Sequence, residues 1–391
     1  MKGSLYPILF AIVLLSRTAS LLGINPENRT QRGSLENSRF AFEHSKKGRV
    51  AFMGGSITEM NGYRPMMMDW LQNKFPQTEF EFVNAGISST CSTTGAFRLE
   101  RDVLSKGPID LLFLEFAVND DQDARHSHEG CILGMEGIIR NFRSTYPKGD
   151  LVVTYFVNPG MLEQLRKGKT PLPMDAHERV LEKYQVSRVH LARELAERIE
   201  EGSFTWEEFG GTHPKPPGNR LCADIHAELL GKAWDRPLAK RALDHPLPKN
   251  PLKSNSFFNG RFLSPGQVQL AQGWNFSEPD WETIPGSKRK RYLDRALLHA
   301  DSSAKPITVS FSGRAFGVFV VGGPDAGKLA YEVDGKRKGV VNLYRHFSKN
   351  LHYPFSVTLA HDLPAGQHQI TLTPMAFENR DSVRILEFCL N

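Results

Sequence analysis

One segment predicts the architecture of this 391-residue chain: Arg49-Val-Ala-Phe-Met-Gly-Gly-Ser-Ile-Thr-Glu-Met60. Apolar residues run into two glycines and Ser56, and a segment with helical character follows. This order is typical of a strand, a tight turn and a helix. Such a turn places a serine at the end of a strand and the start of a helix, where backbone N–H groups favour developing negative charge. Ser56 is therefore a candidate nucleophile, although the same motif in isolation is more often purely structural.

Strand-like and helix-like segments alternate from about residue 40 to residue 240. The strand candidates are 49–53, 79–83, 111–115 and 151–156. The helix candidates are 65–73, 96–104 and 131–146, and 176–202 is expected to form one long amphipathic helical region. This alternation predicts an α/β domain with a parallel sheet covered on both sides by helices. In such sheets the ligand crevice lies beyond the carboxyl ends of the strands.

Two further strand ends carry groups that can hold a negative oxygen. The second strand ends in Val83-Asn-Ala-Gly86, and the third runs through Phe113 to Asn119-Asp120. The backbone N–H groups of Ser56 and Gly86 and the side-chain amide of Asn119 can converge on one oxygen, which is the requirement for an oxyanion hole. Taken singly, Gly86 is an ordinary turn glycine and Asn119 an ordinary strand-end cap.

The candidate base is His213, in Gly210-Gly-Thr-His-Pro214, followed by Lys215-Pro-Pro-Gly-Asn219 and a helix from about Arg220. A histidine in a loop rich in glycine and proline is held by its backbone rather than packed in a core. Taken alone, a loop histidine of this kind is more often structural than catalytic.

In chain order, these motifs read Gly-Gly-Ser56, Ala85-Gly86, Val118-Asn119-Asp120 and Thr212-His213-Pro214. Over roughly residues 45–235 the chain resembles the SGNH subgroup of the GDSL esterases and lipases. The resemblance implies a three-layer, flavodoxin-like sandwich, with Ser56 as the nucleophile and His213 as the general base. It assigns the oxyanion hole to Ser56, Gly86 and Asn119, and it requires neither a metal nor a diffusible cofactor.

Two positions depart from the family pattern. The family usually has aspartate where this chain has Gly55, a mild change because that position is not a catalytic requirement. It also usually has aspartate three residues before the histidine, where this chain has Gly210. An orienting carboxylate fixes the tautomer of the imidazole and stabilises its charged form. The third member is therefore open: a Ser-His dyad, or a triad completed by Glu207 or Glu208.

Polar and charged residues near these motifs allow several interpretations. His126 and His128 lie in a loop after Asn119, for which substrate contact or plain solvation is favoured over a metal site. Arg98 and Arg101, on the expected helix 96–104, are predicted to be surface charges or glycan contacts. The four cysteines, at 91, 131, 222 and 389, are too few for a disulfide scaffold and lack the spacing of a zinc site, so one bridge and free buried thiols both remain open.

The first residues have the pattern of a signal peptide. A positive start at Lys2, an apolar run and small residues near Ser20 predict cleavage after about residue 20. The run is short for a membrane span, with an uncleaved anchor as the alternative. We expect a secreted or periplasmic protein without a stable membrane span after signal cleavage. The net charge of +6 is consistent with attraction to acidic glycans, and the short, scattered basic runs argue against nucleic acid.

A proline-rich stretch divides the chain. We expect a signal peptide at 1–20, an SGNH hydrolase domain at 40–243, a linker at 244–256 and an all-β sandwich or jelly-roll domain at 257–391. Beyond the linker, short alternating runs at 307–311, 316–321, 329–333 and 368–373 predict strands, and Asp334-Gly335 predicts a hairpin. This part resembles the β-sandwich modules that accompany SGNH domains in bacterial carbohydrate esterases.

Aromatic residues of the second domain can stack on sugars or belong to its core. They are Trp274, Trp281, Tyr344, His346, His352 and Tyr353. The segment 343–354 is the loop expected to reach the esterase cleft. Together these features predict a secreted serine esterase that removes acetyl or other small acyl groups from a carbohydrate. The alternatives are a lipase-like or thioesterase-like hydrolase, or an inactive glycan-binding protein on the same scaffold.

Overall fold

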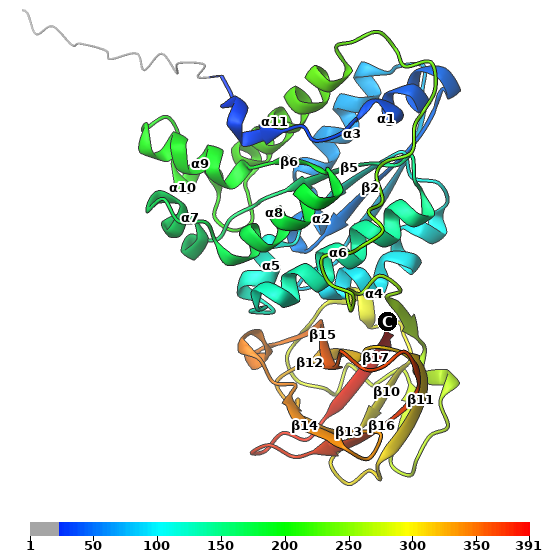
Figure 1. Cartoon of the computed structure of the whole chain (residues 1–391). Helices are drawn as coiled ribbons and strands as arrows, with labels where there is room; N and C mark the ends of the chain where they lie inside the picture. Colours follow the sequence, from blue (N-terminus) through cyan, green and yellow to red (C-terminus); the bar gives the residue numbers. More distant parts are fainter. Residues whose placement is uncertain (1–22) are drawn as a thin grey trace, which may run out of the picture.

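The computed structural model describes residues 23–391 and contains an α/β domain followed by an all-β domain (Figure 1). The predicted signal peptide, residues 1–20, lies outside the described residues. None of the helices in residues 23–391 combines the length and the apolar character that a membrane crossing needs.

The α/β domain is built on a six-stranded sheet of order β1-β6-β5-β4-β2-β3. Its strands are β1 (Arg29–Thr30), β2 (Lys47–Gly54), β3 (Glu79–Gly86), β4 (Leu111–Leu114), β5 (Asp150–Thr154) and β6 (Ser187–Val189). The last five pair in parallel, and β1 adds an antiparallel edge to β6. Without β1, the order is that of the flavodoxin-like fold, as expected. The residues from Val50 to Met53 are fully buried, which suits a central strand covered on both faces.

Helices cover both faces of this sheet. They are α1 (Glu36–Phe40), α2 (Ser56–Glu59), α3 (Tyr63–Lys74), α4 (Ser92–Asp102), α5 (Ala117–Gln122), α6 (His128–Thr145), α7 (Pro159–Arg166), α8 (Leu172–Tyr184), α9 (Leu191–Glu200), α10 (Trp206–Phe209) and α11 (Pro216–Trp234). Helices α4, α6 and α8 pack side by side in one layer, and α3 packs on α11 in the other. The predicted three-layer architecture is confirmed.

The single helical region predicted for 176–202 is wrong. Helix α8 ends at Tyr184, Gln185 takes a left-handed conformation (φ 50°), and β6 follows before α9 begins at Leu191. Val186 and Val189 are fully buried at this edge of the sheet. A three-residue strand between two amphipathic helices is too short to show its own periodicity.

The C-terminal domain is a sandwich of two largely antiparallel sheets, as predicted. One sheet has the order β8-β10-β17-β12-β15-β9, with β7 also paired to β17, and the other has the order β11-β16-β13-β14. The strands are β7 (Arg261–Leu263), β8 (Asn275–Ser277), β9 (Ser287–Lys288), β10 (Leu297–Ala300), β11 (Ile307–Gly313), β12 (Phe316–Gly322), β13 (Lys328–Val333), β14 (Arg337–Asn342), β15 (Leu351–Ala360), β16 (Gly366–Met375) and β17 (Val383–Leu390). Asp334 and Gly335, both with positive φ, form the predicted hairpin between β13 and β14.

Segment 244–256, the predicted linker, contains no helix or strand and is bound along the α/β domain. His245 Nε2 lies 2.8 Å from Asp150 Oδ1, and Arg143 donates to Pro246 O at 3.0 Å. The two domains also share apolar contacts, since Phe97 of α4 packs on Phe257. Helix α4 thus lies between the sheet of the α/β domain and the sandwich (Figure 1).

All four cysteines are buried and unpaired, so the free-thiol alternative is correct.

Candidate active site

Ser56 is the first residue of α2, and only Gly55 separates it from the end of β2 at Gly54. Its Oγ lies 2.7 Å from Nε2 of His213. The turn before it needs glycine: a Cβ at Gly54 would lie 2.0 Å from Glu115 Oε1, and one at Gly55 would lie 2.1 Å from Asn119 Oδ1. The structure therefore joins the predicted nucleophile to the predicted base, and the absence of an aspartate at position 55 leaves room for Asn119.

His213 lies in the loop between α10 and α11. His213 is exposed to solvent. Asn219 Nδ2 stabilises the loop by donating to Pro214 O at 2.6 Å. Partial loss of solvent and the positive charge of Arg289, from the β domain, lower the pKa of His213. A lowered pKa keeps the imidazole neutral near physiological pH, which is the form that accepts a proton.

Asn119 lies in the first turn of α5, against the Gly55 backbone. One Nδ2 hydrogen is donated to Asp123 Oδ2 at 2.8 Å. An amide nitrogen carries two hydrogens, so the second remains available to an oxygen at Ser56. Asp123 thus fixes the carboxamide in the orientation that a preformed donor requires.

Gly86 packs against the backbone of α2, where a Cβ would lie 2.3 Å from Glu59 N. Its N–H donates to Asn84 Oδ1 at 3.0 Å, and its carbonyl accepts from Arg291 of the β domain at 3.2 Å. Its predicted role as an oxyanion donor therefore requires the Asn84 side chain to turn away when substrate binds.

Ser89, in the loop after Gly86, is a candidate second donor that sequence reasoning missed. It has a left-handed conformation (φ 64°) in the turn closed by Thr90 N and Ile87 O at 3.2 Å. Within residues 23–391, the N–H of Ser89 has no hydrogen-bond partner. A non-glycine residue with positive φ is strained, and such strain is frequent at functional sites. Sequence gives no signal for it, because turn chemistry favours glycine or asparagine here.

The third member of a triad does not come from either predicted carboxylate. Glu208 accepts from Thr205 N at 2.8 Å and from Thr205 Oγ1 at 2.9 Å, which makes it the capping-box residue of α10. Glu207 is exposed and has no hydrogen bond to His213 in the described part of the chain. Gly210, the C-cap of α10, has φ 103°, and a Cβ there would lie 2.3 Å from Lys215 N. The geometry favours a Ser-His dyad.

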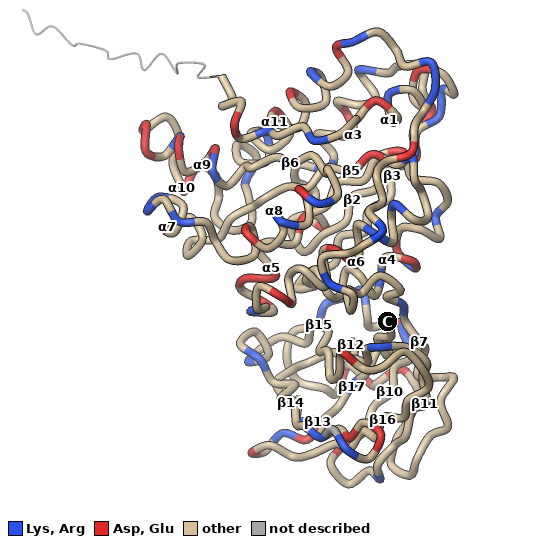
Figure 2. Tube along the Cα trace, viewed as in Figure 1, with Lys and Arg blue, Asp and Glu red and all other residues tan. Residues whose placement is uncertain are grey.

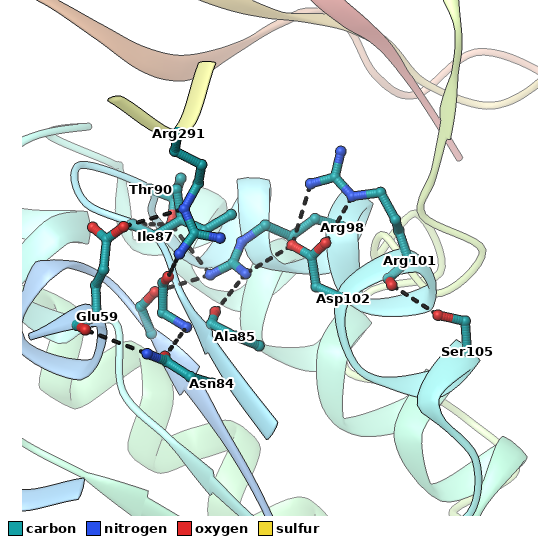
Figure 3. Close-up of polar contacts among 12 residues, drawn as sticks. Glu59, Asn84, Ala85, Ile87, Thr90, Arg98, Arg101, Asp102, Ser105 and Arg291 are labelled. Carbon is teal, nitrogen blue, oxygen red and sulfur yellow. Dashed lines mark hydrogen bonds and ion pairs between the residues drawn. The ribbon is translucent and has the colours of Figure 1, made fainter. Parts of the chain in front are cut away.

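Arg98 and Arg101 do not behave as solvated surface charges. Arg98 is fully buried and donates to Gly54 O of the active-site turn, which contradicts both predictions made for it. Figure 3 shows its side chain beside Ala85 and Asp102. Arg101 lies at the domain boundary, 3.4 Å from Glu387 of the β domain, with its guanidinium over the Phe262 ring. Both arginines therefore hold parts of the protein together: Arg98 bonds two strand ends, and Arg101 bonds the β domain.

His126 and His128 have different surroundings. His128 Nε2 lies 2.8 Å from Asp175 Oδ2. Burial disfavours the charged form of His126, but the neighbouring thiol of Cys91 raises the pKa of His126 overall. Burial likewise disfavours the Cys91 thiolate, but His126 lowers the pKa of Cys91 overall.

Among residues 23–391, two residue groups have ligand atoms close enough for a metal: Asp120 with Cys91 and His126, and Asp120 with Cys131 and His177. However, Asp120 already accepts hydrogen bonds from Ser92 N, Ser92 Oγ and His177 Nε2. These contacts engage both carboxylate oxygens of Asp120 in a hydrogen-bond network beneath Asn119, although Nδ1 of His177 has no partner in the part of the chain that the structure describes.

A cavity of about 630 Å³ lies between α5 and the segment 344–353 of the β domain. It is lined by Asp121, Gln122, Asp123, Ala124, Arg125, Arg345, His346, Phe347 and Tyr353. The predicted loop 343–354 thus reaches the helix that carries Asn119. Figure 2 shows acidic residues along α5, and elsewhere Lys and Arg are interspersed with acidic residues over both domains. Of the six aromatic residues considered for sugar stacking, only Tyr344 and His346 are not buried.

Comparison with known proteins supports this description. Residues 52–221 match the model of the GDSL-like Lipase/Acylhydrolase family. This chain is 20% identical in sequence to two crystal structures of a two-domain esterase (CEX) active on acetylated mannans. The TM-score is 0.75 for the structure co-crystallized with mannopentaose and 0.74 for the other. Each alignment covers 93% of this chain and 97% of the other, so the likeness establishes the two-domain fold.

An acetyl xylan esterase from Geobacillus stearothermophilus, Axe2, is 18% identical over 48% of this chain and 97% of its own, with a TM-score of 0.38. The sequence has no match among the curated proteins.

Proposed function

We propose that this chain, whose α/β domain belongs to the GDSL-like lipase and acylhydrolase family, is a serine esterase that removes acetyl or other small acyl groups from a carbohydrate. The observation that carries the proposal is the 2.7 Å approach of Ser56 Oγ to His213 Nε2. A serine hydroxyl becomes a nucleophile when an adjacent base accepts its proton.

The reaction proceeds in two halves. His213 Nε2 accepts the Ser56 proton while Oγ attacks the ester carbonyl carbon, and the negative oxygen is held by N–H donors. The donors offered are Ser56 N, Asn119 Nδ2 and the N–H of Gly86 or Ser89. The tetrahedral intermediate collapses, and the sugar hydroxyl leaves with the proton from His213. Water, deprotonated by His213, then attacks the acyl-enzyme and releases the acid.

The carbohydrate part of the proposal rests on the cavity between α5 and segment 344–353. Its carboxylate, amide, guanidinium and imidazole groups suit the hydroxyls of a sugar chain, and Phe347, 42% exposed, supplies an apolar face. An acyl chain of a lipid would meet mostly polar groups there, which disfavours the lipase alternative. The two-domain esterase of the same fold is active on acetylated mannans, and we extend that substrate class to this chain.

Export completes the proposal. The positive start, apolar run and small residues of positions 1–20 support a cleaved signal peptide and a secreted or periplasmic enzyme. Expression of the whole chain and sequencing of the mature N-terminus tests this part. A start at Met1 would contradict it.

Hydrolysis of a chromogenic acetyl ester by the purified mature protein, beside Ser56→Ala, tests the esterase. We expect turnover that Ser56→Ala abolishes, and release of acetate from acetylated mannan. Turnover that persists in Ser56→Ala would contradict the assignment of the nucleophile. Folded protein without turnover on either substrate, but with retained affinity for the mannan, would instead support the glycan-binding alternative.

A further inference from the structure

Arg98 is a fully buried arginine whose guanidinium joins the ends of two strands (Figure 3). Nη1 donates to Ala85 O at 2.6 Å, and Nη2 donates to Gly54 O at 2.9 Å. Nη1 also lies 3.1 Å from Asp102 Oδ2, one turn further along α4. Burial of a guanidinium is costly unless its hydrogens are satisfied and its charge is paired. Two of the four acceptors of Arg98 are backbone carbonyls at the active site, and the others are Asp102, which pairs the charge, and Thr90 Oγ1 at 3.3 Å. The Nε of Arg98 has no partner among residues 23–391.

Glu115 is the matching buried acid on the other side of the turn. Its Oε1 accepts from Gly55 N at 2.8 Å and from Thr58 Oγ1 at 2.8 Å. Glu115 is 1% exposed, and burial raises its pKa to about 7, an increase that the nearby Arg98 partly opposes.

The carbonyl of Gly54 and the N–H of Gly55 belong to one peptide group. That peptide is therefore held at both ends, by the guanidinium of Arg98 at its oxygen and by the carboxyl group of Glu115 at its nitrogen. Gly54 O also accepts from Ile87 N at 3.0 Å, which ties the turn to β3. A cationic donor at the oxygen and an acceptor at the nitrogen stabilise one orientation of the peptide dipole, most strongly when Glu115 is ionised.

This peptide immediately precedes the Gly55–Ser56 peptide. Two consecutive glycines have no side chains to restrict their backbone angles, so the turn has little rigidity of its own. Yet both glycines are required, because a Cβ at either would collide with Glu115 or Asn119. The orientation of Ser56 Oγ toward His213 therefore depends on groups outside the turn.

We propose that Arg98 and Glu115 are positioning residues that act as a clamp on the Gly54–Gly55 peptide and thereby fix Ser56 for attack. This inference rests on the proposed esterase function. Arg98 extends the same control to the Ala85–Gly86 peptide, because a donor at Ala85 O polarises the Gly86 N–H. The clamp touches neither the ester nor the sugar, so it should act on turnover and not on substrate affinity.

The test compares Arg98→Lys and Glu115→Gln with matched substitutions remote from Ser56. Arg143 is 2% exposed and also donates to backbone carbonyls, those of Tyr184 and Pro246, while Glu136 is a fully buried acid that accepts from Lys253 N. Arg143→Lys and Glu136→Gln are therefore the controls. The unfolding free energy of all four variants is measured with urea, so that loss of stability is separated from loss of turnover.

We expect kcat for the chromogenic acetate at pH 8, above the pKa of Glu115, to fall about 10- to 100-fold in Arg98→Lys and Glu115→Gln, with KM within about twofold, because small displacements of a reacting group cost rates of this order. The rate at which an aryl phosphonate labels Ser56 should fall by a similar factor. The two controls should lose stability but keep kcat and the labelling rate within about twofold of wild type.

Wild-type kcat and labelling rates in both clamp variants would overturn the inference, as would equal losses in the controls. Should Arg98→Lys fail to fold, Glu115→Gln, which keeps the shape of the side chain, decides the question. A wild-type protein that neither hydrolyses the acetate nor reacts with the phosphonate would contradict the proposed function itself, and the clamp with it. That result differs from an active wild type with unaffected variants, in which only the clamp fails.

Discussion

Ser56 Oγ lies 2.7 Å from His213 Nε2, although the two residues are 157 positions apart. If they act as one unit, their substitutions should not be additive. We expect Ser56→Ala and His213→Ala each to lower kcat by about 10⁴-fold or more, and the double variant to be no slower than the worse single variant. Ser203→Ala, on the exposed loop after α9, is the control and should retain wild-type kcat. Additive losses would mean that the two residues act independently.

Glu208 caps helix α10 and does not orient His213, so we expect it to affect stability and not turnover. Glu207→Gln and Glu208→Gln should both keep kcat within about threefold, because neither carboxylate contacts His213, whereas loss of an orienting carboxylate costs about 10⁴-fold in triad enzymes. Glu208→Ala should lower the unfolding free energy by about 1 kcal/mol, as loss of a capping partner does. Initial rates and urea titrations check the two parts. A large kcat loss in Glu207→Gln would restore the triad.

Gly210 stands where the family usually has an aspartate, three residues before the histidine. The backbone at this position does not accommodate an aspartate. Its φ of 103° disfavours any side chain, and a Cβ would lie 2.3 Å from Lys215 N. We expect Gly210→Asp to lower both stability and kcat, by more than the 1–3 kcal/mol of backbone strain alone in the case of stability. Gly211→Asp has a similar φ of 89° in open space and so measures strain without the collision. A gain in kcat for Gly210→Asp would contradict this account.

Most of the fold could be predicted from the sequence because its strands are long and apolar and its turns are marked by glycine. The predicted strands 49–53 and 79–83 lie within β2 and β3, and Asp334-Gly335 forms its hairpin. Strand β6 was missed because three residues carry no periodic pattern. The boundaries given for the signal peptide, linker and domains stay predictions.

The candidate site was predicted in part, because motifs identify chemical groups but not their surroundings. Ser56 and His213 meet as expected. The burial of Arg98 was missed, although Gly95-Ala-Phe97 and Leu99 around it form an apolar helix segment that could have signalled it. Contacts from the second domain, such as Arg291 to Gly86 O, depend on domain packing, which no local pattern records.

Arg289 links the β domain to the acidity of the base. It contributes, after desolvation, to the lowered pKa of His213. The base must be neutral, so kcat/KM should fall as pH drops through that pKa. Arg289→Gln removes a repelling charge, raises the pKa of His213 and should move the acidic limb to higher pH, by less with 0.5 M NaCl present, since salt screens exposed charges. Lys290→Gln on the same turn is the control, and an unshifted limb in Arg289→Gln would exclude the coupling.

Glu115 should impose a pH dependence on the stability of the fold. Its pKa is raised from 4.5 to about 7 by burial, so the native state favours the protonated form. Stability from this group is fully present below pH 4.5 and is lost as pH rises through 7. Glu115→Gln cannot ionise, so its unfolding free energy relative to wild type should rise between pH 5 and pH 8, by on the order of 2 kcal/mol. Urea unfolding at the two pH values measures this difference, with Glu136→Gln as the control. A difference that is constant with pH would show that Glu115 remains ionised in the native protein, and the carboxylate would then hold Gly55 N as an anion at all pH values tested.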